Sequence, residues 1–191
     1  MNYKELFRIA WLLVSSPARA WKEISMEKDK QKVFSAFVYP MIGLCSLSVF
    51  IHSLRTTGWS SPESFQTAMI ICCAVAISLF GGYFSAAYII NRLSAGMFSL
   101  EDNIPLIRQF CGYALVVTFL IKIVIGFFPE FEIIGWMVEF YTIYVVWEGV
   151  PVLIKVKEKD RLLFTIVTSV ALVVCPTFIQ LVFNKLMAIF Y

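Results

Sequence analysis

Apolar residues fall into five long runs along the chain, separated by short polar stretches. The runs cover residues 33–54, 65–90, 106–128, 132–154 and 162 to about 187. A helix needs roughly 20 mostly apolar residues to cross the hydrocarbon core of a bilayer, so each run is long enough to cross once. The pattern predicts an all-α protein, an integral membrane bundle of five transmembrane helices over residues 33–191.

Residues 1–32 have a different pattern. Apolar residues between Leu6 and Val14 lie beside charged residues such as Arg8, which predicts a short amphipathic helix on the membrane surface. Ser16-Pro17 is typical of a helix N-cap followed by proline at the first helical position, and Trp21 suits the membrane interface. We expect a cytoplasmic interfacial helical segment ahead of the membrane domain; a helix that docks a partner is the alternative.

The composition supports a membrane protein. The chain is 60% hydrophobic and 15% charged, with a mean hydropathy of +0.80. Soluble domains are about 45–50% apolar and about 25% charged, so a soluble globule is excluded. All 16 basic residues except Arg55, Lys122 and Lys185 fall in the N-terminal segment or at the connections after the second and fourth runs. This bias predicts a cytoplasmic N-terminus and an extracytoplasmic C-terminus. Because the basic residues are distributed in this way, we interpret them as a topology signal and not as a nucleic-acid-binding face.

Small residues recur at every fourth position in the second run, and two runs contain a proline. The stripe consists of Ala74, Ser78, Gly82 and Ala86. Small residues at this spacing let two helix backbones approach closely, so we interpret the stripe as a packing face within the bundle, with a dimer seam as the alternative. Pro40 and Pro176 are expected to kink the first and fifth helices.

Two opposite charges are expected to meet inside the membrane. The third and fourth runs are joined by a short turn near Glu130, which predicts an antiparallel hairpin. Lys122 and Glu139 then lie at nearly equal depth, roughly 12 Å from the turn at 1.5 Å per residue. Ionisable groups at this depth are costly unless they are paired. We therefore predict an ion pair between Lys122 and Glu139.

Further polar residues in the runs are candidates for a structural role or for passing a proton, a cation or a small solute. Arg108 is near a membrane end and can extend to the headgroups. Glu148 lies about 180° round the helix from Glu139, in a stretch where Pro151 frees a backbone carbonyl near Trp147. The fifth run carries a polar stripe expected to face the bundle interior: Thr177, Gln180 and Asn184.

The chain shows no catalytic motif. It has no phosphate-binding loop, nucleophile elbow or metalloprotease motif. The single histidine, His52, has no partners at metal-ligand spacing, and the five cysteines lie in apolar runs without CxxC spacing. We therefore expect no enzymatic activity, no metal site and no cofactor.

Three segments resemble the Yip family, the Ypt-interacting-protein domain of five-span membrane proteins. They are the opening Ser16-Pro17-x-x-x-Trp21-x-x-Ile24, the Phe80-Gly81-Gly82-Tyr83 stretch, and Tyr141 to Lys159 with its Gly149-x-Pro151. The resemblance implies a fold and supplies no catalytic residues. Eukaryotic members look like trafficking factors that bind prenylated small GTPases, and they carry a long polar cytoplasmic N-terminal region. The short segment 1–32 is more similar to a compact prokaryotic member of the plasma (inner) membrane.

Together these observations predict a non-enzymatic membrane scaffold or organiser. Its expected surroundings are the lipid bilayer and, as a possible partner, a second copy or another membrane protein. The alternative is a channel or transporter that uses the buried charges and the polar stripe of the fifth run. A transporter needs a continuous wet path, whereas a scaffold needs only satisfied polar pairs.

Overall fold

The computed structural model describes residues 3–27, 29–30, 32–59, 61–98 and 100–190, and every element in these ranges is helical. The elements are α1 (Tyr3–Ser15), α2 (Pro17–Ser25), η1 (Phe34–Val38), α3 (Tyr39–Thr57), α4 (Pro62–Met97), α5 (Ile104–Ala114), α6 (Val116–Phe127), η2 (Pro129–Phe131), α7 (Glu132–Glu139), α8 (Tyr141–Gly149), η3 (Val150–Ile154) and α9 (Glu158–Phe190). Two of them, η1 and η3, are π-helical turns. The predicted all-helical fold is confirmed.

Four stretches are long and apolar enough to cross a membrane: Phe34–Thr57, Pro62–Met97, Ile104–Phe127 and Glu158–Met187. A fifth crossing results if Pro129–Glu139 and Tyr141–Ile154 are taken as one span bent by 41°. At the bend, the Ile143 N–H bonds to the Phe140 carbonyl at 3.1 Å, three residues back and not four. The apolar run 132–154 therefore forms a broken helix, where the sequence pattern predicted a continuous one.

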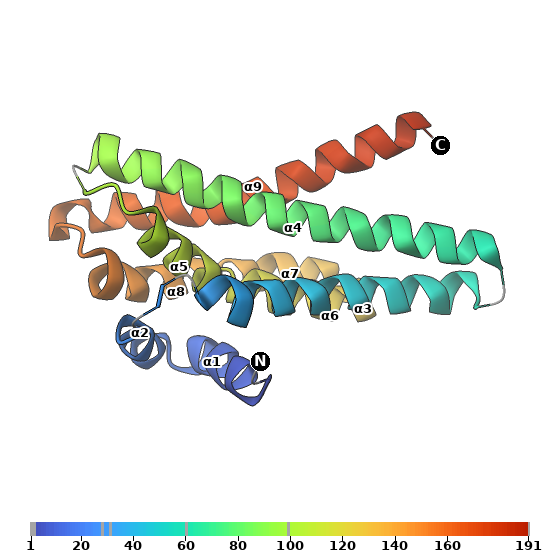
Figure 1. Cartoon of the computed structure of the whole chain (residues 1–191), viewed down its shortest axis with the longest axis horizontal. Coiled ribbons are helices and arrows are strands. Elements are labelled where there is room, and N and C mark those ends of the chain that lie inside the picture. The colour runs from blue at the N-terminus through green and yellow to red at the C-terminus, as the bar shows by residue number, and fades with distance from the viewer. Residues whose placement is uncertain (1–2, 28, 31, 60, 99, 191) are drawn as a thin grey trace.

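Local sequence signals set the ends of the long helices. Gly58 has a φ of 97°, which ends α3 in a conformation that favours glycine. The Ser61 hydroxyl accepts the Ser64 N–H at 3.0 Å and starts α4, with Pro62 in its first turn. Asn103 caps α5 in the same way, accepting the Leu106 N–H at 3.1 Å. Figure 1 shows the result, a bundle whose helices run along one long axis.

The helices α4 and α9 pack along each other, and Gly82 of the small-residue stripe lies at their contact. Ala74, Ser78 and Ala86 are buried, and a Cβ added to Gly82 would lie 2.6 Å from the Pro176 Cα. Figure 1 shows that α9 changes direction about midway along its length, consistent with the proline inside it. In the first span, Pro40 directly follows the π-helical turn η1, so the irregularity expected there is present as a widened turn.

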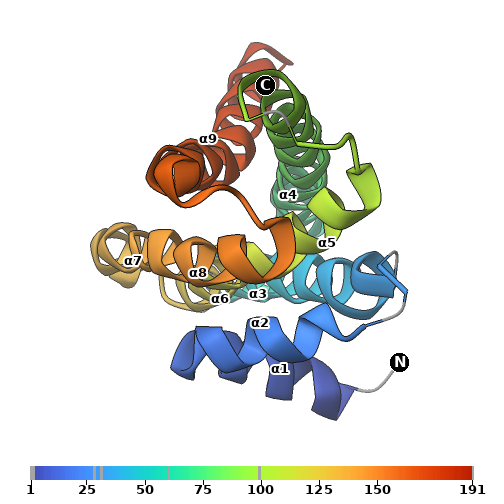
Figure 2. The same cartoon turned by 90° about the vertical axis from the view of Figure 1, so that its left-hand side faces the viewer.

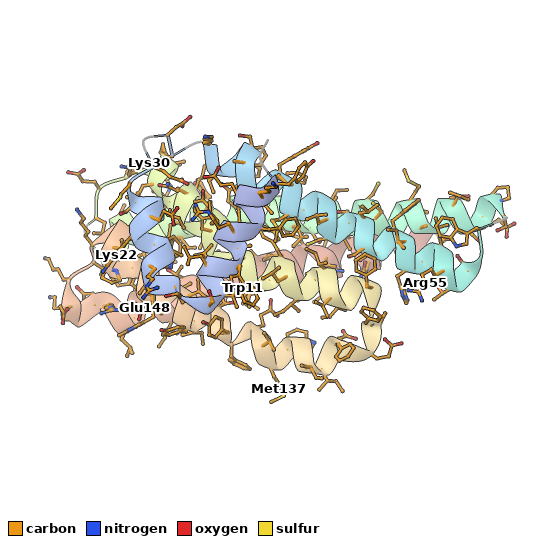
Figure 3. The ribbon with its side chains drawn as sticks, turned by 90° about the horizontal axis from the view of Figure 1, so that it is seen from below. Trp11, Lys22, Lys30, Arg55, Met137 and Glu148 are labelled. Carbon is orange, nitrogen blue, oxygen red and sulfur yellow. The ribbon has the colours of Figure 1, made fainter. Side chains whose placement is uncertain are left out.

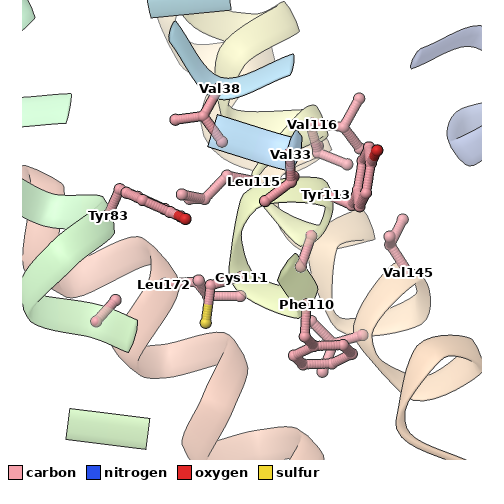
Figure 4. Close-up of a cluster of buried hydrophobic side chains, with 14 of the residues drawn as sticks. Val33, Val38, Tyr83, Phe110, Cys111, Tyr113, Leu115, Val116, Val145 and Leu172 are labelled. Carbon is pink, nitrogen blue, oxygen red and sulfur yellow. The ribbon is translucent and has the colours of Figure 1, made fainter. Parts of the chain in front are cut away.

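A cluster of buried side chains lies where the start of the first span meets α4, α5, α8 and α9. Figure 4 shows Val33, Tyr83, Phe110, Cys111 and Leu172 converging there from these segments. Gly112 allows the approach, because a Cβ on it would lie 2.8 Å from a methyl group of Val38. This region holds the broken helices together at the same end of the bundle as α1 and α2.

The two N-terminal helices lie crosswise to the bundle. Figure 2 shows α1 and α2 along one side of it, and Figure 3 shows both running across its long axis. They form a hairpin, defined here as residues 3–25, that packs mainly on α8, η3 and α6. Pro17 opens α2 as predicted, although the Ser16 hydroxyl makes no capping bond.

Candidate functional site

Trp21 joins the hairpin to the membrane bundle. Its indole N–H donates to the Val145 carbonyl at 2.8 Å, and its ring stacks on Phe110 with centroids 5.1 Å apart. The side chain is 0% exposed. A Cβ on Gly149 would lie 2.5 Å from the indole Cε2 atom, so only glycine allows α8 to approach this closely. Two of the segments that carry the family resemblance therefore touch each other.

Additional hydrogen bonds fix the hairpin and the chain that follows it. The Tyr141 hydroxyl donates to the Val14 carbonyl at 2.7 Å. The Glu27 carboxylate accepts from the Gln109 amide at 3.0 Å and from the Tyr113 hydroxyl at 2.9 Å. The hairpin and the residues that follow it are thus tied to the third span and to the broken fourth span.

An ion pair links the two helices of the hairpin to each other. The Arg8 guanidinium donates to both carboxylate oxygens of Glu23, to one of them at 3.0 Å. The hydrogen bond from Arg8 holds the pKa of the Glu23 carboxyl below its ordinary value. Both groups are exposed, so the pair orients the helices but adds little stability.

The helix α1 has apolar residues on two adjacent sides, one buried and one exposed. Leu6, Ala10 and Leu13 are buried against the molecule. Tyr3, Phe7 and Trp11 are 57%, 52% and 73% exposed and lie one turn apart along the neighbouring side, about a quarter turn round the helix. We call these three residues the aromatic face; Figure 3 shows Trp11 on α1. Exposed aromatic side chains of this kind suit the membrane interface.

Lys122 and Glu139 belong to one polar cluster inside the membrane, but each has a different nearest partner. The Lys122 ammonium donates to the Gln180 Oε1 at 3.2 Å, and the Thr118 hydroxyl donates to the Glu139 Oε1 at 3.2 Å. In the described part of the chain, no contact within 4.0 Å pairs Lys122 with Glu139, although their charges interact at longer range. The cluster joins α6 to α7 and α9.

The carbonyl that Pro151 frees is occupied by a residue of the same chain. The Arg161 guanidinium donates to the Trp147 carbonyl at 3.0 Å and stacks over the Trp147 ring, 3.9 Å from its centroid. Glu148, the next residue, is half-buried at the end of α8, the helix on which α2 packs. Figure 3 shows Glu148 at the same end of the molecule as Lys22.

The remaining predicted polar residues do not converge on the cluster. The Thr177 hydroxyl donates to the Val173 carbonyl of its own helix at 2.8 Å, and Asn184 is exposed. Arg108 lies with its guanidinium over the Phe84 ring, 5.6 Å from the centroid. Of the fifth-run stripe, Gln180 is the member that reaches the cluster.

Buried hydroxyl groups on two sides of a cavity were missed by sequence reasoning. The cavity, of about 220 Å³, lies between the α7–α8 break and α9, and its lining includes Glu139, Thr142 and Ser169. The hydroxyls of Thr142 and Ser169 are buried and have no hydrogen-bond partner. One available signal was the three-residue spacing from Glu139 to Thr142, which places both on one helix face. Within the described residues, no group of three or more His, Cys, Asp or Glu side chains is arranged to hold a metal ion.

The structure defines a polytopic helical membrane protein whose crosswise N-terminal hairpin is fixed to the third span and to the broken fourth span. A protein with these apolar helices lies in a lipid bilayer. The sequence matches the Yip1 domain over residues 11–179, and the chain belongs to the Yip1 domain family. The match includes Trp21, Gly149 and Pro151 and confirms the resemblance drawn from those motifs. No curated protein and no solved structure gives a significant match to the chain.

Proposed function

We propose that this Yip1 domain protein is a non-enzymatic membrane organiser that holds its hairpin as a wedge in one leaflet. The observation that carries the proposal is the fixed crosswise position of α1 and α2, tied through Trp21 and Tyr141 while the aromatic face points away from the bundle. An amphipathic helix in a membrane surface buries its apolar side about 5–10 Å deep, and its binding depends on curvature.

The fixed hairpin makes the protein wider in one leaflet than in the other. A free amphipathic helix binds and leaves a membrane reversibly, whereas this one is anchored by five membrane crossings in our proposal. Its exposed aromatic residues then remain at one depth. The expected consequence is local bending of the bilayer or sorting of the protein to curved regions.

The basic-residue bias supports a cytoplasmic hairpin; a prokaryotic plasma membrane is the location that we propose from the family resemblance. A reporter fused after Lys159 is expected to be cytoplasmic, and one fused after Tyr191 extracytoplasmic, because basic loops are retained on the cytoplasmic side. Alkaline phosphatase and fluorescent-protein fusions measure the two sides. The reverse pattern would contradict the orientation and move the wedge to the outer leaflet.

The organiser proposal is tested with the full chain in liposomes. Electron cryomicroscopy of vesicles at increasing protein density is expected to show smaller or tubular vesicles for the wild type. Changing Phe7 and Trp11 to serine should abolish the effect, because it removes the exposed apolar side of α1. Trp136→Ser is the matched control, since Trp136 is also exposed, at 54%, but lies on α7. Equal vesicle shapes for all three proteins would contradict the proposal.

Transport of a proton or cation is the second candidate, and one observation favours it. The Glu139 carboxylate lies beside a cavity within the membrane. The other cavity walls are largely apolar, and Arg161 already occupies the carbonyl near Glu148, so the organiser proposal is better supported. Proton and cation flux into liposomes distinguishes transport from the organiser proposal. Flux that Glu139→Gln or Glu148→Gln abolishes supports transport, and the absence of flux with the wild type rejects it.

A further inference from the structure

A second cavity lies at the membrane end where the first and third spans begin. It has a volume of about 230 Å³ and is bordered by Lys30, by Phe34 of η1, by Phe84 of α4 and by Arg108 of α5. Figure 3 shows Lys30 at the same end of the molecule as Lys22. Neither the hairpin proposal nor the Glu139 cluster uses this cavity.

Two basic side chains border the cavity, and no described acidic residue does. Within the described residues, neither Lys30 nor Arg108 forms an ion pair with a carboxylate. The Arg108 guanidinium carbon lies 5.6 Å from the Phe84 ring centroid, and no described residue accepts a hydrogen bond from this guanidinium, so its N–H groups are available to a ligand. Those groups match the oxygen atoms of a phosphate group, which accepts two parallel hydrogen bonds.

The position of Arg108 is fixed by its surroundings. The Tyr83 hydroxyl donates to the Arg108 carbonyl at 3.2 Å, and Tyr83 itself is 0% exposed. Phe34 stacks on the Tyr83 ring with centroids 6.1 Å apart and contacts Phe84 at 5.6 Å. The cavity therefore has a rigid aromatic floor, so an anion meets a site that is already organised.

The depth of the cavity matches the phosphate level of a bilayer. Lys30 precedes the span that begins at Phe34, and Arg108 lies one turn inside the span that begins at Ile104. Phe84 is 41% exposed on the lipid-facing side of α4, next to the cavity. A ligand with a phosphate and acyl chains would contact both the basic residues and the aromatic surface.

We propose that this cavity binds the headgroup phosphate of an anionic phospholipid, with Lys30 and Arg108 as the phosphate-binding residues. Basic pockets between membrane helices bind anionic headgroups in this way. The exposed aromatic border favours a lipid over free phosphate, since inorganic phosphate would use the two cations alone.

Lipid binding to the full chain in detergent tests the proposal. Native mass spectrometry measures retention of phosphatidylglycerol, with phosphatidylethanolamine and inorganic phosphate as separate arms. We expect Arg108→Gln and Lys30→Gln each to weaken phosphatidylglycerol binding about fivefold, because each basic residue near a membrane surface contributes about 1 kcal/mol. The double variant is expected to weaken binding about 25-fold.

Arg92→Gln is the matched control. Arg92 lies on α4 near the same membrane end, but its guanidinium donates to the Tyr88 hydroxyl at 3.3 Å and does not border the cavity. This variant should bind phosphatidylglycerol as the wild type does, and Arg108→Lys should keep part of the affinity. Circular dichroism checks that each variant is folded. Unchanged binding in the double variant, equal retention of phosphatidylethanolamine, or full competition by inorganic phosphate would overturn the proposal.

Discussion

The two sides of the bundle are built differently. On one side, α4 and α9 are continuous helices of 36 and 33 residues that pack through small residues and Pro176. On the other side, the fourth span is split into α7, α8 and η3 and bends by 41° between α7 and α8. The hairpin is attached to the broken side, through Trp21 and Tyr141.

The difference shows what a helix break provides within a membrane. A continuous helix uses almost all its backbone carbonyls internally and offers neighbours only a surface to pack on. The fourth span offers carbonyls as well: Pro151 frees that of Trp147, which accepts from Arg161, and that of Val145 accepts from Trp21. The helices α4 and α9 pack against each other through side chains, whereas α8 also binds side chains of α2 and α9 through its backbone carbonyls.

Trp21→Ala is expected to have the largest effect, because it empties a fully buried site on the broken side. Loss of a buried aromatic side chain costs about 3–5 kcal/mol. Unfolding in mild detergent, followed by circular dichroism, measures the loss of stability. Limited proteolysis should also cut the hairpin sooner.

Trp21→Phe serves as the control for the preceding change, since it keeps a ring on Phe110 and removes the bond to Val145. It should lose about 1 kcal/mol, the net value of one hydrogen bond. If Trp21→Ala is as stable as the wild type, the hairpin is not anchored by this residue.

Gly82→Val tests the continuous side. The added side chain meets Pro176, so we expect a loss of about 1–3 kcal/mol from overpacking between α4 and α9. Thermal unfolding in detergent measures it. Gly43→Ala is the control, because a Cβ there meets nothing within 4 Å. A Gly82 variant as stable as the Gly43 variant would mean that the two helices do not pack as closely as described.

Double-mutant cycles separate the two possible partners of Lys122, which lies between the two sides. The pair Lys122→Met with Gln180→Leu should show a coupling of about 0.6 kcal/mol, typical of hydrogen bonds between membrane helices. Lys122→Met with Glu139→Gln reports the ion pair predicted from the sequence. A larger coupling for the second pair would make Glu139 the true partner and Gln180 incidental.

The smallest effect is expected from the exposed pair within the hairpin. Because Arg8 lowers the pKa of Glu23, the folded hairpin favours the ionised carboxylate. Its contribution is therefore present above the ordinary carboxyl pKa and is lost as the pH falls through the lowered value. Unfolding of the full chain in mild detergent, followed by circular dichroism at a series of pH values, reports the change. Glu23→Gln should remove this pH dependence, and a variant that keeps it would contradict the assignment.

Hydropathy alone predicted the spans well. Every crossing needs about 20 apolar residues to span the hydrocarbon core, and it must be helical so that its backbone groups are hydrogen-bonded. Residues 33–54, for example, correspond to Phe34–Thr57. The break at Phe140 was not predicted, because no proline or glycine lies at that position. Pro151 did indicate a free carbonyl near Trp147. The bond from Arg161 to this carbonyl could not be predicted, because it depends on how α9 folds back onto α8.

The attachment of the hairpin could not be derived from local pattern. Trp21 and Val145 are 124 positions apart, and no periodicity relates them. Trp21 was expected at the membrane interface, but it is fully buried, and its contact with Gly149 required the fold. The same holds for Lys122, whose depth was predicted from residue counting while its contact with Gln180 depends on the rotation of α9 about its axis.

The π-helical turn η1 limits where the chain can tolerate an insertion or a deletion. It contains one residue more than an α-helical turn, and its bond runs from the Tyr39 N–H to the Phe34 carbonyl. Deleting one residue between Phe34 and Val38 would restore an ordinary turn and rotate everything before it by about 100°. Val33 would leave its contact with Gly112, and the hairpin would face a different neighbour. Insertions and deletions are therefore expected to be tolerated in the loop around Gly58 and rejected in this short segment.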